Sequence, residues 1–220
     1  MENYPMRINK YLALKNITTR KGADDLIKNK KVFINGTLAI LGSKVKENDE
    51  VVVKEEKKKK IYKYYAYNKP RGLATPEIYS EGLFPIGRLD KDSQGLLILT
   101  NDGRITDKLL NPKYLHEKEY LVKISNKLRS NFKQKMEMGV QIENYKTRPC
   151  KIQIIDDHQF KIILTEGKKH QIRRMCSALF QEISDLKRIR IMNIELGNLK
   201  PNKLREIKGK ELKKFLSQIF

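Results

Sequence analysis

The pattern of apolar positions in the N-terminal part of the chain predicts two helices followed by a small sheet. Hydrophobic residues recur at helical spacing in residues 7–16 and 20–29. A β-hairpin is predicted over residues 32–39, because its central Asn-Gly pair suits a type I′ turn. Three consecutive valines at residues 51–53 add a short strand. Together these elements indicate a small α/β domain.

The pattern after residue 60 is dominated by strands. Continuous or alternating apolar runs predict strands over residues 61–67, 96–99, 120–124, 150–155, 159–165, 186–196 and 205–207. Helical periodicity predicts helices over residues 104–110, 126–138 and 209–220. Many strands combined with few helices predict an α+β fold class for this part.

A run of charged residues separates the two parts of the chain. Residues 54–60 have no apolar period and are interpreted as a linker. The predicted organisation is an N-terminal domain over residues 1–56, a basic linker over residues 57–60 and a second domain over residues 61–220. A chain of 220 residues has room for one medium domain and one small domain.

The charge of the chain indicates a polyanionic partner. The formal net charge is +21, and residues 1–60 contribute +7 of it, so both parts can contact phosphate. Nucleic acid is the first candidate partner and an anionic membrane surface is the second. No apolar run approaches the roughly 18 residues that a membrane-spanning helix needs. We therefore expect a cytoplasmic protein without a membrane partner.

The cysteines and histidines give no sign of a metal site. Cys150 and Cys176 are isolated from each other and lack the spacing of metal ligands or of a disulfide framework. The three histidines, His116, His158 and His170, are scattered along the chain. Each is interpreted as a surface or hydrogen-bonding residue, and no metal is expected.

Asp90 lies in a loop between two glycines, directly before an apolar run that reads as a buried strand, residues 96–99. A charged loop on a rigid strand is a common way to position a reactive side chain. The alternative is that Asp90 only accepts hydrogen bonds from neighbouring N–H groups in a turn. Local chemistry alone favours this second interpretation.

The sequence around Asp90 favours the interpretation as a reactive side chain. The stretch FPIGRLDKDSQGLLILTNDG closely resembles the catalytic motif of RNA pseudouridine synthases of the RsuA/RluF family. The aspartate of GRLD is the nucleophile in that family, which assigns this role to Asp90. Near the N-terminus, RINKYLA, RKGADDLI and VFINGTLA resemble recurring phrases of the S4 RNA-binding domain. The resemblance implies a pseudouridine synthase fold, in which flanking helices cover a large mixed, mostly antiparallel sheet.

Further motifs of the family match along the chain. Lys118 and Tyr120 match its Lys-x-Tyr motif, whose tyrosine packs on the target base and is the candidate general base. A plain strand tyrosine is the alternative for Tyr120. The stretch EGKKHQIRRM resembles the third motif, in which the arginine at the position of Arg173 pairs with the catalytic aspartate and the next arginine, Arg174, follows it. Its basic helix start is unfavourable for the helix dipole, as is expected at a functional site.

The candidate RNA-binding residues come from both parts of the chain. Arg7, Lys10, Arg20 and Lys21 lie on the two N-terminal helices, where a shared basic face can follow an RNA backbone; the alternative for some of these side chains is simple solvation. Arg88 beside Asp90 is expected either to fill the vacated base stack or hold a phosphate, or to pack in the turn. Lys69 belongs to NKPRG, which resembles the KPxG motif of the family.

The predicted reaction is the isomerisation of a uridine to pseudouridine in ribosomal RNA. The wording LKRIRIMNIELGNLKPNKLREI resembles the RluF branch, which implies large-subunit RNA, with tRNA as a possible second substrate. The reaction needs no redox step, so no cofactor is expected, and a monomer is expected. Only residues 73–83 separate two motifs that the family usually spaces more widely. The alternatives are a non-catalytic RNA-binding assembly factor and a structural ribosomal protein.

Overall fold

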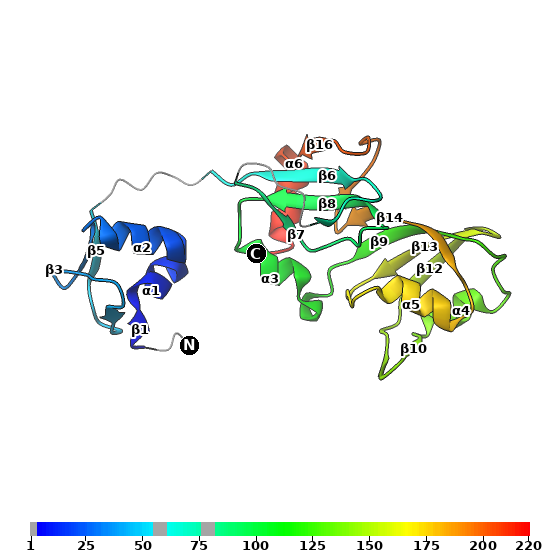
Figure 1. The fold of residues 1–220 in the computed structure, drawn as a ribbon, viewed down its shortest axis with the longest axis horizontal. Coiled ribbons are helices and arrows are strands. Elements are labelled where there is room, and N and C mark those ends of the chain that lie inside the picture. Colours follow the sequence, from blue (N-terminus) through cyan, green and yellow to red (C-terminus); the bar gives the residue numbers. More distant parts are fainter. Residues whose placement is uncertain (1–3, 55–60, 76–81) are drawn as a thin grey trace. The chain divides into compact units, whose positions relative to one another are not determined.

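The computed structural model describes residues 4–54, 61–75 and 82–220, and it divides into two compact units, Met1–Ile61 and Tyr62–Phe220 (Figure 1). The first unit contains β1 (Met6–Arg7), α1 (Ile8–Leu14), α2 (Arg20–Lys28), β2 (Val32–Ile34), β3 (Thr37–Leu38), β4 (Lys44–Val45) and β5 (Val51–Val53). The two predicted helices, the hairpin and the valine strand are confirmed.

Local sequence explains the elements of the first unit. Asn35 and Gly36 both have positive φ, 49° and 76°, which the predicted type I′ turn between β2 and β3 requires. The Thr19 side chain caps α2 by accepting a hydrogen bond from the Gly22 N–H at 3.1 Å. Ile8 and Leu12, four residues apart on α1, are buried in the core of this unit.

The second unit is built on a large sheet. Its elements are β6 (Tyr64–Lys69), β7 (Phe84–Ile86), β8 (Gln94–Thr100), α3 (Ile105–Leu110), a 3₁₀ helix (Pro112–Tyr114), β9 (Lys118–Ile124), α4 (Phe132–Glu137), β10 (Gln141–Ile142), β11 (Tyr145–Lys146), β12 (Lys151–Asp156), β13 (Gln159–Leu164), α5 (Gln171–Ala178), β14 (Ile183–Ile191), β15 (Ile194–Glu195), β16 (Leu204–Glu206) and α6 (Gly209–Ser217).

The strand order confirms the predicted mixed, mostly antiparallel sheet. The strands run in the order β12-β13-β9-β14-β8-β6-β16, with β15 beside β14 and β7 beside β8. Only the pairing of β14 with β8 is parallel in this described sheet. This parallel pair lies at the centre, where segments far apart in the sequence meet.

The two faces of the sheet carry different layers. On one face, α3 and α6 pack against β6, β8 and β14 (Figure 1). Phe215 of α6 is fully buried there. On the other face, α4 and α5 pack against β9, β12 and β13. Beside them a smaller apolar cluster joins Tyr67 and Leu97 of the sheet to Leu89 of the loop after β7. This second face therefore holds both α5 and the loop that contains Asp90.

The helix predicted over residues 126–138 is shorter than expected. Only Phe132–Glu137 is helical, and the prediction was wrong for the residues before it. The Leu128 N–H donates to the carbonyl of Asp157, and the Ser125 N–H donates to that of Glu182. Hydrogen bonds to distant segments therefore replace the first turns of the helix, which periodicity alone does not predict.

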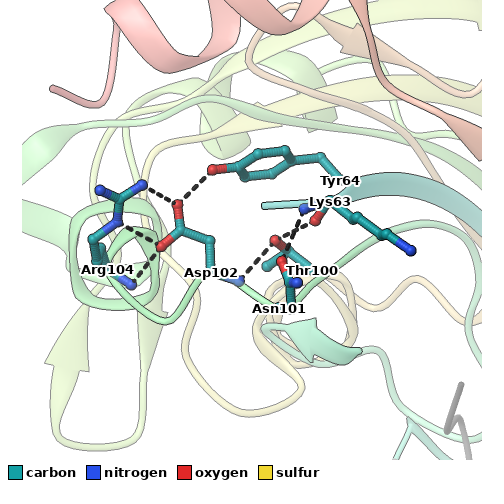
Figure 2. A network of polar contacts seen from close by, with 6 residues as sticks. All are labelled: Lys63, Tyr64, Thr100, Asn101, Asp102 and Arg104. Atoms are coloured by element: carbon teal, nitrogen blue, oxygen red, sulfur yellow. Dashed lines mark hydrogen bonds and ion pairs between the residues drawn. The ribbon is translucent and has the colours of Figure 1, made fainter. Parts of the chain in front are cut away.

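A buried network around Asp102 joins the start of β6 to the end of β8 and the start of α3 (Figure 2). The fully buried Asp102 carboxylate accepts hydrogen bonds from the Tyr64 hydroxyl and from the Arg104 guanidinium and N–H. Thr100 Oγ1 accepts from the Asp102 N–H and donates to the Lys63 carbonyl. Asp102 therefore orders the chain before α3, with the Arg104 guanidinium and N–H as its main partners.

Candidate active site

The loop that carries Asp90 is fixed by hydrogen bonds from a neighbouring segment. The Thr75 hydroxyl accepts from the Leu89 N–H at 3.0 Å and donates to the Leu89 carbonyl at 2.6 Å. Within the loop, the Ser93 N–H donates to the Asp90 carbonyl. Leu89 is buried, whereas 39% of the Asp90 side chain is exposed. The carboxylate is thus presented to solvent from a rigid backbone.

Lys69 also holds this loop, through a hydrogen bond to its backbone. Its side chain is fully buried at the end of β6, and the ammonium donates to the carbonyls of Pro70, Leu73 and Lys91. The structure therefore gives Lys69 a different role from the expected contact with RNA. Burial behind its own carbonyl partners keeps the ammonium away from a ligand, and its charge instead ties the KPRG turn to the Asp90 loop.

His170 lies beside Asp90, with its Nε2 atom 3.4 Å from Asp90 Oδ1. It occupies the N-cap position of α5 with a φ of 53°, a conformation that non-glycine residues rarely adopt. The preceding turn is fixed because Gln171 donates from Nε2 to the buried Glu166 carboxylate and accepts from the Lys168 N–H. Sequence reasoning missed this residue, because its contact with Asp90 spans 80 residues and only its place in the third motif marked it.

Arg173 also approaches the loop, but by a different contact from the expected one. Its Nη2 donates to the Asp92 carbonyl at 3.1 Å and to Ser93 Oγ at 3.4 Å. Within the described residues, the Asp90 carboxylate contacts the His170 imidazole and forms no ion pair with Arg173. Arg173 is thus brought to the Asp90 loop, where it binds the backbone two residues after the carboxylate.

Tyr120 lies in the middle of the sheet on the face that carries the loop. On β9 it pairs with Ile162 of β13 and with Arg188 of β14. Its ring packs against the apolar cluster that contains Leu89, the residue before Asp90. Asp90, Tyr120 and Arg173, far apart in sequence, are therefore brought to one region of the second unit.

Arg188 is a second residue that sequence reasoning missed. It is buried on β14, where its Nε donates to the Leu96 carbonyl and its Nη2 has no hydrogen-bond partner. Its guanidinium carbon lies 5.9 Å from the centre of the Tyr120 ring. Gly95 allows this close packing of β14 on β8, because a Cβ there would lie 2.3 Å from the Arg188 carbonyl oxygen.

Lys118 lies two residues before Tyr120 on the same strand, so its side chain points to the same face of the sheet. It is half-buried, and its ammonium donates to the His116 carbonyl at 3.4 Å. Burial, and then the positive charge of Arg188, lower the pKa of Lys118 to about 8. The basic residue predicted beside Tyr120 is therefore a partly desolvated amine rather than a fully solvated cation.

The other candidate residues of this unit lie at its surface or point elsewhere. Arg88 is exposed beside the loop and forms no polar contact with the described residues. Arg174 forms an ion pair with Glu143 at 2.6 Å and lies over the Tyr145 ring, so it points toward the β10–β11 hairpin. Arg88 is thus available to a ligand near Asp90, whereas Arg174 is not brought to Asp90.

Three basic residues of the first unit line a pocket of about 400 Å³. Arg7, Lys10 and Arg20 line it together with Asn9, Pro5 and Met6. Lys21 is exposed and is not part of the lining. Three of the four predicted residues therefore form one cationic surface, with the Asn9 amide held by the Asp24 carboxylate.

Two further features of the described residues bear on the class of site. No group of three or more histidine, cysteine or acidic side chains there is arranged to hold a metal ion. Within the same residues, no helix combines the length and the apolar character that crossing a membrane requires.

Comparison with known families places the chain in a class. Residues 46–178 match the RNA pseudouridylate synthase family, and residues 6–51 match the S4 domain. The first match spans more than half of the chain. The chain therefore belongs to the RNA pseudouridylate synthases and is an RNA pseudouridine synthase, an isomerase, with an N-terminal S4 domain.

Individual relatives cover nearly the whole chain. The dual-specificity RNA pseudouridine synthase RluF of Escherichia coli strain K12 is 38% identical over 94% of this chain and 77% of its own length. The ribosomal large subunit pseudouridine synthase B of Bacillus subtilis is 32% identical over 94% of this chain and 92% of its own. The ribosomal small subunit pseudouridine synthase A of Haemophilus influenzae is 30% identical over 96% of this chain and 100% of its own.

A solved structure supports the fold as well as the family. The crystal structure of a pseudouridylate synthase superposes with a TM-score of 0.70 and 27% identity, covering 98% of this chain and 100% of the other. The predicted fold class, an S4-like domain followed by a pseudouridine synthase fold, is confirmed.

Proposed function

We propose that the protein isomerises a uridine of ribosomal RNA, with large-subunit RNA as its main substrate and tRNA as a possible second one. In this proposal residues 1–56 bind RNA and residues 61–220 carry the chemistry, in the cytoplasm and as a monomer. The names of the relatives with 38% and 32% identity support this choice, because one is called dual-specific and the other acts on the large ribosomal subunit. The net charge of +21 suits such a polyanionic substrate.

The observation that carries the proposal is the presentation of Asp90. A half-exposed carboxylate stands on a loop that Thr75 and Lys69 hold by its backbone. We infer that this carboxylate acts as the nucleophile on C1′ of the target uridine, or assists formation of a glycal. Either route breaks the bond between N1 and C1′ and releases the uracil within the site, so no redox partner is needed.

Tyr120 supports the second half of the reaction. After the uracil turns, C5 bonds to C1′ and Asp90 regains its free carboxylate. C5 must then lose a proton, while N1 gains one, so that the product is an isomer of the substrate. Tyr120 packs beside the Asp90 loop, and in this proposal its hydroxyl takes the C5 proton directly or through water.

His170 and Arg173 hold the nucleophile from the side of α5. The His170 imidazole contacts the carboxylate, and Arg173 fixes the backbone at Asp92 and Ser93. In this proposal Arg173 positions the loop in the free protein, and its pairing with Asp90 belongs to the complex with RNA. The exposed Arg88 lies where it can contact the RNA from which the target nucleotide is extruded, at a cost of a few kcal/mol.

The alternative raised by the sequence, a non-catalytic RNA-binding assembly factor, is not supported by the site. It would need the cationic pocket of the first unit but not the assembly of Asp90, Tyr120 and His170 on one face of the sheet. Retention of that assembly favours the enzyme.

The test is to map pseudouridines in the ribosomal RNA and tRNA of cells with and without this protein. The proposal predicts that at least one pseudouridine of large-subunit RNA disappears without the protein and returns when it is supplied. An unchanged map in all RNAs would overturn the proposed substrates. Loss of a site only in small-subunit RNA or tRNA would overturn the assignment to the large subunit.

A further inference from the structure

Two cations beside Tyr120, Lys118 on β9 and Arg188 on β14, lack a counter-charge. Arg188 is 4% exposed, and its Nη2 has no partner, while the Lys118 ammonium has only a long hydrogen bond to a carbonyl. Within the described residues, no carboxylate lies within an ion-pair distance of either cation. The neighbouring acidic residue, Glu119, faces the opposite side of the sheet, where it accepts from Arg190.

Such an arrangement is costly unless a ligand completes it. A buried charge without a partner destabilises a fold by several kcal/mol, and two neighbouring like charges add repulsion. Proteins accept costs of this kind at functional sites, where a ligand supplies the missing charge. Tyr120 is a neighbour of both residues in the sheet, since it pairs with Arg188 and follows Lys118 by two positions. The uncompensated charge is therefore located beside the ring that packs near Asp90.

We propose that Lys118 and Arg188 form a phosphate-binding site beside Tyr120, which receives a backbone phosphate of the nucleotide being isomerised. This inference rests on the proposed function, because the nucleotide is the substrate of that reaction. The half-buried Lys118 ammonium makes the contact, and three donors on a flexible stem suit a phosphate oxygen. Arg188 is shielded from water and acts as a fixed charge behind the site. A full negative charge is required, which a neutral uracil carbonyl does not supply.

The titration of Lys118 offers a direct readout. The groups around its ammonium are His116 and Tyr120 on its own segment and Arg188 on β14, while its partner on β13 is the apolar Leu164. A phosphate bound there favours the charged form of the amine and raises its pKa from the value of about 8 in the free protein. Binding is thus coupled to uptake of a proton and weakens as the pH rises above 8.

The experiment is an NMR titration of the full chain labelled with ¹³C at lysine Cε, with the Lys118 signal assigned from its absence in Lys118→Gln. The probes are inorganic phosphate, uridine 5′-monophosphate, uridine and a short single-stranded RNA. We expect the pKa of Lys118 to rise with each phosphate-containing probe and to stay unchanged with uridine. The RNA should act at the lowest concentration, because its other phosphates bind the same basic protein.

Variants separate this role from a purely structural one. Arg188→Gln should raise the pKa of Lys118 only in part in the free protein, since burial is the larger cause, and should weaken the response to phosphate. Lys118→Gln should raise the KM for RNA roughly tenfold, the size of one charge-assisted hydrogen bond. The control Lys123→Gln removes an exposed lysine of the same strand and should change the KM far less.

The outcomes that overturn the inference are specific. A Lys118 pKa that no phosphate-containing probe moves would mean that Arg188 only supports the Tyr120 ring. A response to inorganic phosphate but not to RNA would exclude the RNA backbone as ligand. Because the titration needs no turnover, it reports on the site even if the uridine specificity proposed above proves wrong.

Discussion

At the scale of single residues, the contact between His170 and Asp90 makes the orientation of the nucleophile testable. Asparagine tolerates the positive φ of position 170, so His170→Asn keeps the backbone while it removes the imidazole. Both side chains are partly exposed, so we expect loss of the contact to raise the reaction barrier by up to about 1 kcal/mol and to lower kcat roughly fivefold. Single-turnover rates check this. His158→Asn, in an exposed turn, is the control and should leave the rate unchanged.

Lys118 gives a second prediction at this scale, on stability. Its pKa falls from the ordinary 10.5 to about 8 in the folded protein, so between these values the unfolded chain binds a proton that the folded protein lacks. Stability should therefore rise from pH 8 to pH 10, by on the order of 2 kcal/mol from this group. Urea unfolding should show that Lys118→Met flattens the rise. An equal slope in wild type and variant would contradict the burial of the cation, and Lys123→Met serves as the control.

At the scale of elements, the Asp102 network holds the ends of two strands and the start of α3 together (Figure 2). Burial opposes the charge of Asp102, but the hydrogen bonds from Arg104 and Tyr64 outweigh it and lower the pKa of the carboxyl. The contribution of the Asp102 carboxylate to the free energy of unfolding is therefore present above the unfolded pKa, near 4. It is lost as the pH falls through the lower pKa of the folded protein.

Asp102→Asn should cost about 2 kcal/mol of unfolding free energy at neutral pH, because the amide cannot accept both bonds from the guanidinium. The loss should shrink below pH 4, where the carboxyl of the unfolded wild-type chain takes up a proton that the folded protein binds only at lower pH. Denaturant midpoints at the two pH values measure this. Asp107→Asn, on α3 outside this network, is the control and should be nearly neutral.

Elements were predicted from sequence where a local pattern determines them. The valine strand and the Asn-Gly hairpin follow from propensity and turn chemistry, and α2 follows from its period and cap. The helix start before Phe132 was predicted wrongly, because its backbone binds distant carbonyls. The candidate site was only partly predicted for the same reason. The motif gave Asp90 and Tyr120, but the contacts of His170 and the orphaned charge of Arg188 arise from strand pairing, which no local pattern encodes.

At the scale of the whole molecule, the positive charge is divided between two units that each form their own core. Deleting residues 1–56 should leave the second unit folded with slow activity, because all strands of its sheet come from the second unit itself. RNA affinity should fall and its dependence on salt should become shallower, since an RNA bound through fewer cationic side chains releases fewer counterions. Filter binding at several salt concentrations measures both.

A full-length control separates the basic pocket from the rest of the first unit. Arg7→Gln, Lys10→Gln and Arg20→Gln combined should reduce the salt slope by up to about three, one for each phosphate that these side chains no longer neutralise. If the slope stays unchanged in both the deletion and the triple variant, the first unit does not bind the RNA backbone.

The central claim is that Asp90 performs the covalent chemistry, and the most direct test compares two neighbouring aspartates. Asp90→Asn keeps the shape of the side chain but removes the nucleophile, whereas Asp92 contributes its carbonyl, and not its carboxylate, to the contact with Arg173. Pseudouridine formation should be measured with each purified variant on the RNA identified by mapping, together with RNA affinity. The account predicts that Asp90→Asn forms no detectable pseudouridine while it binds RNA as tightly as the wild type, and that Asp92→Asn stays active. Product formation by Asp90→Asn at a rate near that of the wild type would contradict it.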